Sequence, residues 1–344
     1  MNNRRDFITF LSLLSVSSIF SINQSKQING LINSNSKLYP KALKPGNKVA
    51  ITAPAGAVWD FNQVNVFCAI LKNFGFEVLL GDTLNLKYGY FAGTDEQRAN
   101  ELNSFFKDKT IDAIFCMKGG WGCARILDLI DYESIKQNPK ILIGFSDITA
   151  LLIAITQQTG LITFHGPVGN SGWNEFTSNV FKQICIDGIA LTYPENPVNE
   201  SKPHVIKQGI ATGELIGGNL TVLTSMLGSN YLPDFTNKIL FLEEAKEEPY
   251  SIDRMLTQLK LAGVFNKVNA ILFGKCNKCI AEEPDKAFTT EQVLEQHFNN
   301  LKIPVVSNLM IGHIENKLTL PIGALATINT KLGVLKLNNR VVNL

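Results

Sequence analysis

Residues 140–155 read KILIGFSDITALLIAI, and this stretch decides the class of fold. The six residues from Lys140 to Phe145 predict a buried strand, and the Ile- and Leu-rich residues from Asp147 onward predict a packed helix. A strand that runs directly into a helix is the local unit of a parallel sheet covered by helices. The lone hydroxyl of Ser146 lies at the corner between the two elements.

The same alternation of strands and helices precedes this stretch. The predicted units are a strand and Pro/Gly turn over 48–56, a helix over 64–75, a strand over 76–81, a helix over 94–108 capped by Thr94, and a strand, glycine-rich turn and helix over 111–130. The spacing predicts an N-terminal α/β domain, residues 37–170, with a flavodoxin-like parallel sheet between helices. In such sheets, ligands bind at the carboxyl ends of the strands.

The second half of the chain has a different pattern. Residues 171–208 are polar and contain prolines, and we expect them to link two domains. Residues 209–344 mix strands with two helical segments and end in short alternating strands. This pattern predicts a C-terminal domain that is β-rich, of the α+β or barrel-like kind.

The composition limits the possible functions. The chain has 344 residues, of which 45% are hydrophobic, enough for the cores of two domains. The formal net charge is only +2, and no run of like charges stands out. Because a basic field that could recruit nucleic acid is missing, we expect no nucleic-acid partner.

The N-terminus differs from the rest of the chain. Arg4 and Arg5, followed by Phe7 and a short apolar stretch rich in serine, resemble a twin-arginine export signal. The apolar stretch is too short for a comfortable membrane span. We therefore assign residues 1–36 to a signal and spacer, and expect an exported, periplasmic protein with no membrane span once the signal is removed. An uncleaved N-terminus that tethers the protein to the membrane is the alternative.

Two of the six cysteines, Cys276 and Cys279, form the motif CNKC. One C-x-x-C without a second pair or nearby histidines is a weak zinc signal. A local disulfide or two free thiols fits this pair better. The sequence predicts neither a metal site nor a cofactor.

Ser146 has two possible roles. A strand-to-helix corner projects the hydroxyl from the sheet and aims the free N–H groups of the first helical turn at the reacting oxygen, as a nucleophile needs. A serine in this position is equally an N-cap of the following helix. The glycine-rich turn MKGGWGCAR, residues 117–125, matches neither the dinucleotide nor the P-loop spacing. Its backbone N–H groups could serve a phosphate or an oxyanion.

Four histidines are candidates for a general base. His297 lies in a polar helix and is expected on the solvated surface, while His204 falls in the linker. His165 follows an apolar strand, and we expect a structural role for it. His313 follows a glycine and begins a loop, so it is placed to project from the scaffold.

A carboxylate could orient such an imidazole and stabilise its charged form. The stretch KILFLEEAKEEPY, residues 238–250, offers Glu243 at the end of an apolar strand. We expect Glu244, Glu247 and Glu248 to form a solvated acidic turn.

Six separated motifs, taken together, resemble a known family. They are, in chain order, APAG, KGGWGCARILDLID, IGFSDITALL, GELIGGNLTVLTSMLGS, FLEEAKEEPYSIDRMLTQL and GHIENKLTLPIG. From about residue 44 to 340 the chain resembles the LD-carboxypeptidase family of serine peptidases, family S66, which includes the microcin C self-immunity peptidases. Agreement at six ordered points is far more specific than any single motif.

The resemblance implies a role for each matching residue. Ser146 would be the nucleophile, Glu243 the orienting carboxylate and His313 the general base. The backbone N–H groups of Gly120 and Asp147 would stabilise the oxyanion.

The resemblance also implies a pocket and an assembly. Trp121 and Arg125, both in the glycine-rich turn, would line the pocket. Members of the family are commonly homodimers, so a homodimer is expected here.

The implied reaction is metal-free acyl transfer that removes the terminal D-alanine from a murein tetrapeptide. The same chemistry on aminoacyl-nucleotide peptides of the microcin C kind is one alternative. A non-catalytic exported ligand-binding protein is another, and it would not need Ser146, Glu243 and His313 together. Many family members act in the cytoplasm, whereas the apparent export signal would place this protein beside the cell wall.

Overall fold

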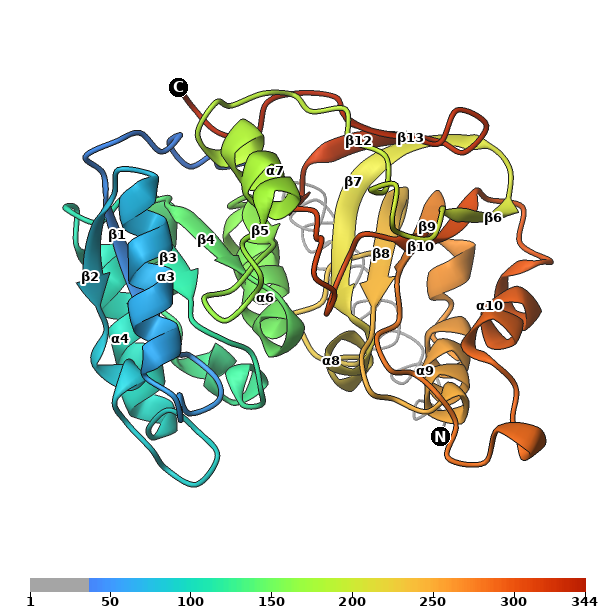
Figure 1. Cartoon of the computed structure of the whole chain (residues 1–344), viewed down its shortest axis with the longest axis horizontal. Coiled ribbons are helices and arrows are strands. Elements are labelled where there is room, and N and C mark those ends of the chain that lie inside the picture. The colour runs from blue at the N-terminus through green and yellow to red at the C-terminus, as the bar shows by residue number, and fades with distance from the viewer. Residues whose placement is uncertain (1–36) are drawn as a thin grey trace, which may run out of the picture. The chain divides into compact units, whose positions relative to one another are not determined.

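The structure, a computed structural model, describes residues 37–344. The predicted export signal lies outside these residues. The described part forms one compact unit with two β-sheets. Figure 1 shows the first sheet mainly in the blue-to-green part of the chain and the second in the yellow-to-red part.

The first sheet has six strands in the order β11-β5-β4-β3-β1-β2. Strands β1 to β5 run parallel, and β11 pairs with β5 in the antiparallel direction. The strands are β1 (Lys48–Thr52), β2 (Glu77–Leu80), β3 (Ala113–Cys116), β4 (Ile141–Gly144), β5 (Thr163–His165) and β11 (Leu320–Ile322). The helices of this part are α3 (Asn62–Asn73), α4 (Asp95–Lys107), α5 (Tyr132–Gln137), α6 (Thr149–Thr159) and α7 (Glu175–Cys185).

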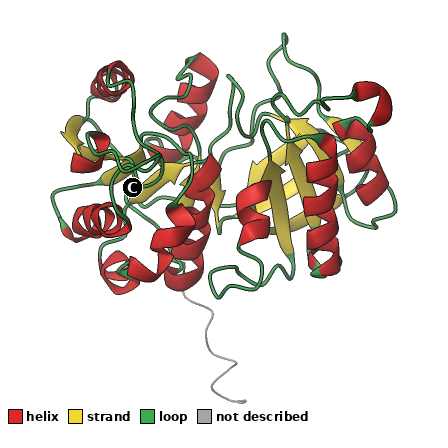
Figure 2. Cartoon of the chain, turned by 90° about the horizontal axis from the view of Figure 1, so that it is seen from below, coloured by secondary structure: helices red, strands yellow, loops and turns green. Residues whose placement is uncertain are grey.

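Local sequence explains these elements. Every residue of β3 and β4 is buried, as expected for parallel strands covered on both faces. Helix α4 begins with a capping box, in which the Thr94 hydroxyl accepts the Gln97 N–H and the Gln97 side chain accepts the Thr94 N–H. Figure 2 shows the helices, in red, around both groups of strands. The strand and helix predicted within residues 140–155 are confirmed as β4 and α6.

The second sheet has seven strands in the order β13-β12-β7-β8-β9-β10-β6. Its centre, β7 to β10, is parallel, while β6, β12 and β13 are antiparallel to their neighbours. The strands are β6 (His204–Lys207), β7 (Ile210–Asn219), β8 (Lys238–Glu243), β9 (Ala270–Gly274), β10 (Val305–Leu309), β12 (Leu325–Asn329) and β13 (Val334–Leu337). The helices are α8 (Leu220–Ser225), α9 (Pro249–Leu261) and α10 (Thr290–Phe298).

The fold class predicted from the sequence is confirmed: a parallel-sheet α/β part is followed by a β-rich part with helices. The stretch expected to be a linker, 171–208, contains α7 and β6. The expected domain boundaries stay a prediction. None of the helices within residues 37–344 is long and apolar enough to cross a membrane.

The two sheets meet at close contacts between α6 and β7. The Thr149 hydroxyl oxygen, at the start of α6, accepts the Asn219 N–H at 3.0 Å. A side chain at Gly218 would place its Cβ only 2.4 Å from that hydroxyl oxygen. Glycine is therefore required at position 218, because any side chain there would prevent α6 from packing this closely on β7.

Candidate active site

Ser146 occupies a strained corner. Strand β4 ends at Gly144, Phe145 is extended, and Ser146 has a φ of +64° at the start of a short 3₁₀ turn, Ser146–Ile148, that leads into α6. A non-glycine residue with positive φ is uncommon and costs free energy. Such strain is typical of a serine that a sharp turn holds out at the end of a sheet.

The hydroxyl of Ser146 does not cap the helix. The N-cap position of α6 belongs to Ile148, and no side chain caps it. The Ser146 Oγ instead lies 3.0 Å from Nε2 of His313, within hydrogen-bond distance. The N-cap interpretation of Ser146 is therefore wrong.

His313 joins Ser146 to a buried carboxylate. Its Nδ1 lies 2.8 Å from Oε2 of Glu243, the last residue of β8, which is fully buried. The residue before the imidazole, Gly312, has a φ of +105°, and a Cβ there would fall 2.4 Å from the same Oε2. Only glycine allows the loop to bring the imidazole this close to Glu243.

Two further contacts hold His313 in place. The ring of Phe145 meets it edge-on, with 4.8 Å between ring centroids. From the CNKC loop, the Asn277 side chain donates to the backbone carbonyl oxygen of His313 at 2.7 Å. These contacts fix the orientation of His313 between Ser146 and Glu243.

The electrostatics of this pair favour an ionised carboxylate. Burial by itself would raise the pKa of Glu243, but the hydrogen bond and charge of His313 lower it below its ordinary value. Burial likewise opposes the charged form of His313, but the hydrogen bond and charge of Glu243 raise its pKa above the ordinary value. The imidazole is therefore a stronger base than a free histidine.

The glycine-rich turn lies directly against Ser146. A Cβ at Gly119 would fall 2.7 Å from Ser146 Cβ and 2.9 Å from its Oγ. The next residue, Gly120, has a φ of +123°. The turn is tied to the corner by Asp147, whose buried carboxylate accepts the Cys123 N–H at 2.8 Å. The structure thus brings Gly120 and Asp147, the two expected oxyanion donors, to the same corner as Ser146.

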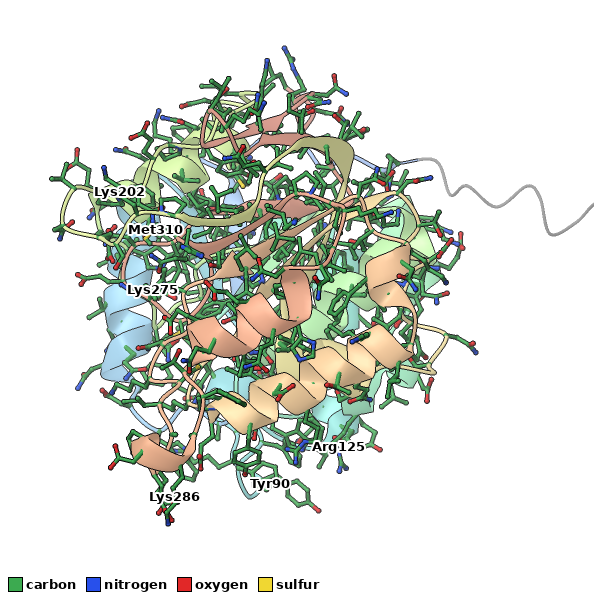
Figure 3. The ribbon with its side chains drawn as sticks, turned by 90° about the vertical axis from the view of Figure 1, so that its right-hand side faces the viewer. Tyr90, Arg125, Lys202, Lys275, Lys286 and Met310 are labelled. Atoms are coloured by element: carbon green, nitrogen blue, oxygen red, sulfur yellow. The ribbon has the colours of Figure 1, made fainter. Side chains whose placement is uncertain are left out.

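The two expected pocket residues lie further out on the turn. Trp121 is 45% exposed. The guanidinium of Arg125 packs on the ring of Phe91 at 5.1 Å and binds the Asp95 carboxylate with both Nε and Nη2, at 2.7–3.1 Å. Arg125 lies near Tyr90 on the surface (Figure 3). A role of Trp121 or Arg125 in the pocket stays a prediction.

Two expectations about neighbouring residues are wrong. His297 is not on the solvated surface: its side chain is 9% exposed and its Nε2 lies 2.7 Å from Asp253. Glu244 is buried rather than solvated, because it accepts the N–H groups of Thr221 and Ala245 and the Asn219 side chain at 2.9–3.0 Å. In both cases, the partner that removes the side chain from water lies on another element.

The remaining candidates from the sequence are two histidines and the two cysteines of the CNKC motif. His165 is buried on β5, with its ring between those of Phe145 and Phe241, and His204 lies on β6. Cys276 and Cys279 are free cysteines.

Sequence reasoning missed Phe145 and Gly312 as parts of the site, and it considered Gly119 only within a turn of possible backbone donors. Each is adjacent in sequence to a residue that was singled out. Their positions in the sequence were therefore noticeable, but the contacts that make them part of the site are seen only in the folded structure.

A strained serine at a strand-to-helix corner, an imidazole and a buried carboxylate in hydrogen-bonded series define the serine-type hydrolases. Comparison with known proteins specifies the class further. Residues 49–166 match the model of the LD-carboxypeptidase N-terminal domain, and residues 212–328 match that of the C-terminal domain. The chain belongs to the LD-carboxypeptidase family, peptidase family S66, as the sequence motifs predicted.

Three relatives illustrate the family. A probable murein peptide carboxypeptidase of Bacillus subtilis is 39% identical, over 88% of this chain and 94% of its own. The murein tetrapeptide carboxypeptidase of Pseudomonas aeruginosa is 32% identical, over 82% and 92%. The microcin C7 self-immunity protein MccF of Escherichia coli is 33% identical, over 74% and 81%. A solved structure of MccF with glutamyl sulfamoyl guanosine matches with a TM-score of 0.80 and 27% identity, over 89% of this chain and 100% of that chain.

Proposed function

We propose that this protein is a serine LD-carboxypeptidase that removes the terminal D-alanine from murein tetrapeptides, with Ser146 as nucleophile, His313 as general base and Glu243 as orienting carboxylate. The observation that carries the proposal is the hydrogen-bonded series from Ser146 through His313 to Glu243. A binding protein would have no need of this series at a strained corner.

In the first step, His313 Nε2 takes the proton of the Ser146 hydroxyl as Oγ attacks the carbonyl carbon of the scissile bond. The negative charge that develops on the carbonyl oxygen is stabilised by the backbone N–H groups of Gly120 and Asp147. Oxyanion donors of this kind contribute roughly 2.7–4 kcal/mol each to the transition state.

In the second step, the imidazolium of His313 gives its proton to the leaving nitrogen, and free D-alanine departs. The remaining acyl group is bound as an ester to Ser146. Water, deprotonated by His313, then hydrolyses this ester and restores the serine. Throughout, Glu243 holds the imidazole in one tautomer and stabilises its charged form, which is why a buried, ionised carboxylate suits this position.

The relatives support the choice of substrate. Two of those described above carry names that refer to murein peptides. The alternative is an aminoacyl-nucleotide peptide, and the similarity to MccF, solved with glutamyl sulfamoyl guanosine, favours it as the second candidate. Both substrates would use the same acyl-transfer chemistry.

Export and assembly are part of the proposal. The paired arginines Arg4 and Arg5 support export to the periplasm, where the enzyme would trim peptide stems of the cell wall in place. We also propose that the protein is a homodimer, as its family suggests.

Incubation of the purified protein with murein tetrapeptide, followed by mass spectrometry, tests the function. We expect loss of one alanine residue with the wild type and none with Ser146→Ala. A parallel incubation with an aminoacyl sulfamoyl adenosine tests the second candidate. Turnover of that compound alone would contradict the murein assignment, and alanine loss catalysed equally by Ser146→Ala would contradict the role of the serine.

A further inference from the structure

Two lysines in the described part of the chain are almost fully buried, and they differ in their partners. Lys140 is 5% exposed, and its ammonium donates to the carbonyl oxygens of Asp108 and Ile111, both at 2.6 Å. Lys317 is 4% exposed, yet its Nζ makes no hydrogen bond or ion pair within residues 37–344. The Nζ of Lys317 is not itself fully buried, so its three donors, unlike those of Lys140, are open to a bound group.

The ammonium of Lys317 lies at the candidate active site. Its Nζ is 5.6 Å from the centre of the Phe145 ring, the ring that also meets the imidazole of His313. Phe145 directly precedes Ser146. One aromatic ring therefore contacts both the unpaired cation and the general base.

The charges around Lys317 come from several elements. Glu243 on β8 and Glu315 in its own loop favour the ammonium, whereas His165 on β5 and His313 oppose a further positive charge when they are protonated. Burial outweighs the two carboxylates and lowers the pKa of Lys317 to about 8. The carboxylate of Glu243 binds His313 through Oε2, and its other oxygen, Oε1, is buried without a hydrogen-bond partner, so Glu243 acts on Lys317 through its charge and not through a hydrogen bond.

A carboxypeptidase must recognise the free carboxylate of the residue that it releases. During the reaction, His313 protonates the leaving nitrogen, so the leaving residue has to lie beside this imidazole. Its carboxylate is separated from that nitrogen by a single Cα. A lysine ammonium is a compact cation with three donors that suits a carboxylate at this position.

We propose that Lys317 binds the terminal carboxylate of the leaving amino acid and thereby limits the enzyme to the carboxyl end of its substrate. This inference rests on the proposed function. It assigns Lys317 to substrate selection and leaves the acyl-transfer steps to Ser146, His313 and Glu243.

The test compares two substrates that differ only in the charge of their C-terminal group. One is murein tetrapeptide with its free carboxylate, and the other is the same peptide with a C-terminal amide; release of D-alanine or D-alaninamide is followed by mass spectrometry. The wild type is expected to prefer the free acid by about 10- to 100-fold in kcat/KM, the range of a hydrogen bond between charged groups. In Lys317→Met this preference is expected to vanish, through a raised KM for the free acid, with the amide little affected.

Two further variants control for folding. Lys317→Arg keeps the charge and is expected to retain part of the preference for the acid. Lys140→Met removes the other buried ammonium and is expected to lower stability while leaving the ratio between the two substrates unchanged. A ratio is insensitive to the fraction of folded enzyme, so partial unfolding of Lys317→Met does not obscure the result.

The outcomes separate the two proposals. A wild-type preference for the acid that persists in Lys317→Met would overturn the role of Lys317 while leaving the proposed function intact. A wild-type enzyme that releases neither D-alanine nor D-alaninamide would instead overturn the proposed function, and with it this inference.

Discussion

At the scale of single residues, Ser146 differs from the other serines that the structure describes. Ser146 has positive φ, lies against a glycine that no larger residue could replace, and is within 3.0 Å of an imidazole nitrogen. Strain of this kind persists only where surrounding contacts maintain it. Here the contacts are those of His313 and of the glycine-rich turn.

The pH dependence of kcat/KM tests the pair of His313 and Glu243. The base must be neutral to accept a proton, and its pKa is raised by Glu243, so activity should fall as the pH drops through a midpoint above about 6.5. In Glu243→Gln the charge that raises this pKa is gone. The midpoint should therefore move to lower pH, and kcat should fall by roughly 10³- to 10⁴-fold.

Glu133→Gln is the control for this prediction, because Glu133 is a mostly exposed carboxylate on α5. It should leave both the rate and the profile unchanged. If Glu243→Gln kept the wild-type midpoint, Glu243 would not be the group that sets the basicity of His313.

At this scale, some residue properties could be predicted from the sequence and others could not. The hydroxyl, carboxylate and imidazole that meet in the structure were all selected from motifs, because their types and order match a recognisable pattern. The surroundings of Glu244 and His297 could not be predicted in this way. Their burial comes from partners such as Asn219 and Asp253, which are distant in sequence and give no local signal.

At the scale of elements, two turns that follow parallel strands form the part of the site around Ser146. The glycine-rich turn follows β3, and the Ser146 corner follows the neighbouring strand β4. Because carboxyl ends of parallel strands lie at one edge of a sheet, the two turns are adjacent. Backbone donors of one turn can then face the hydroxyl of the other.

Gly119→Ala tests the fit between these turns. The new Cβ would approach Ser146 Cβ to 2.7 Å, so the serine must shift from its position beside His313. A displacement of this kind should lower kcat by about 100-fold or more. Circular dichroism should show that the fold remains.

The matched control is Gly172→Ala, whose added Cβ would meet nothing closer than 3.7 Å. It should have wild-type activity. Equal activity of Gly119→Ala and Gly172→Ala would show that the glycine-rich turn does not constrain Ser146.

Most strands and helices could be predicted from the sequence, because their signals are local. Apolar runs gave β3 and β4, and the cap at Thr94 gave the start of α4. The place of β11 could not be predicted. This three-residue strand belongs to the last third of the chain but completes the first sheet beside β5, a pairing set by tertiary contacts alone.

At the scale of the whole molecule, each half of the chain carries an incomplete site. The first sheet carries Ser146, while Glu243 ends a strand of the second sheet and His313 lies in the loop that leads to β11. Ser146 and His313 are 167 positions apart in sequence, and Glu243 and His313 are 70 apart. Only the packing of the two sheets brings the three side chains together, which is why motif order alone could not show that they meet.

The most direct test of this assembly is covalent labelling by a fluorophosphonate, which reacts with an activated serine and needs no knowledge of the substrate. We expect one phosphonyl adduct per chain in the wild type, located by mass spectrometry of peptides to Ser146 and absent from Ser146→Ala. Because His313 activates the hydroxyl, labelling of His313→Ala should be at least about 100-fold slower. An adduct on another residue, or an equal labelling rate in His313→Ala, would contradict the account.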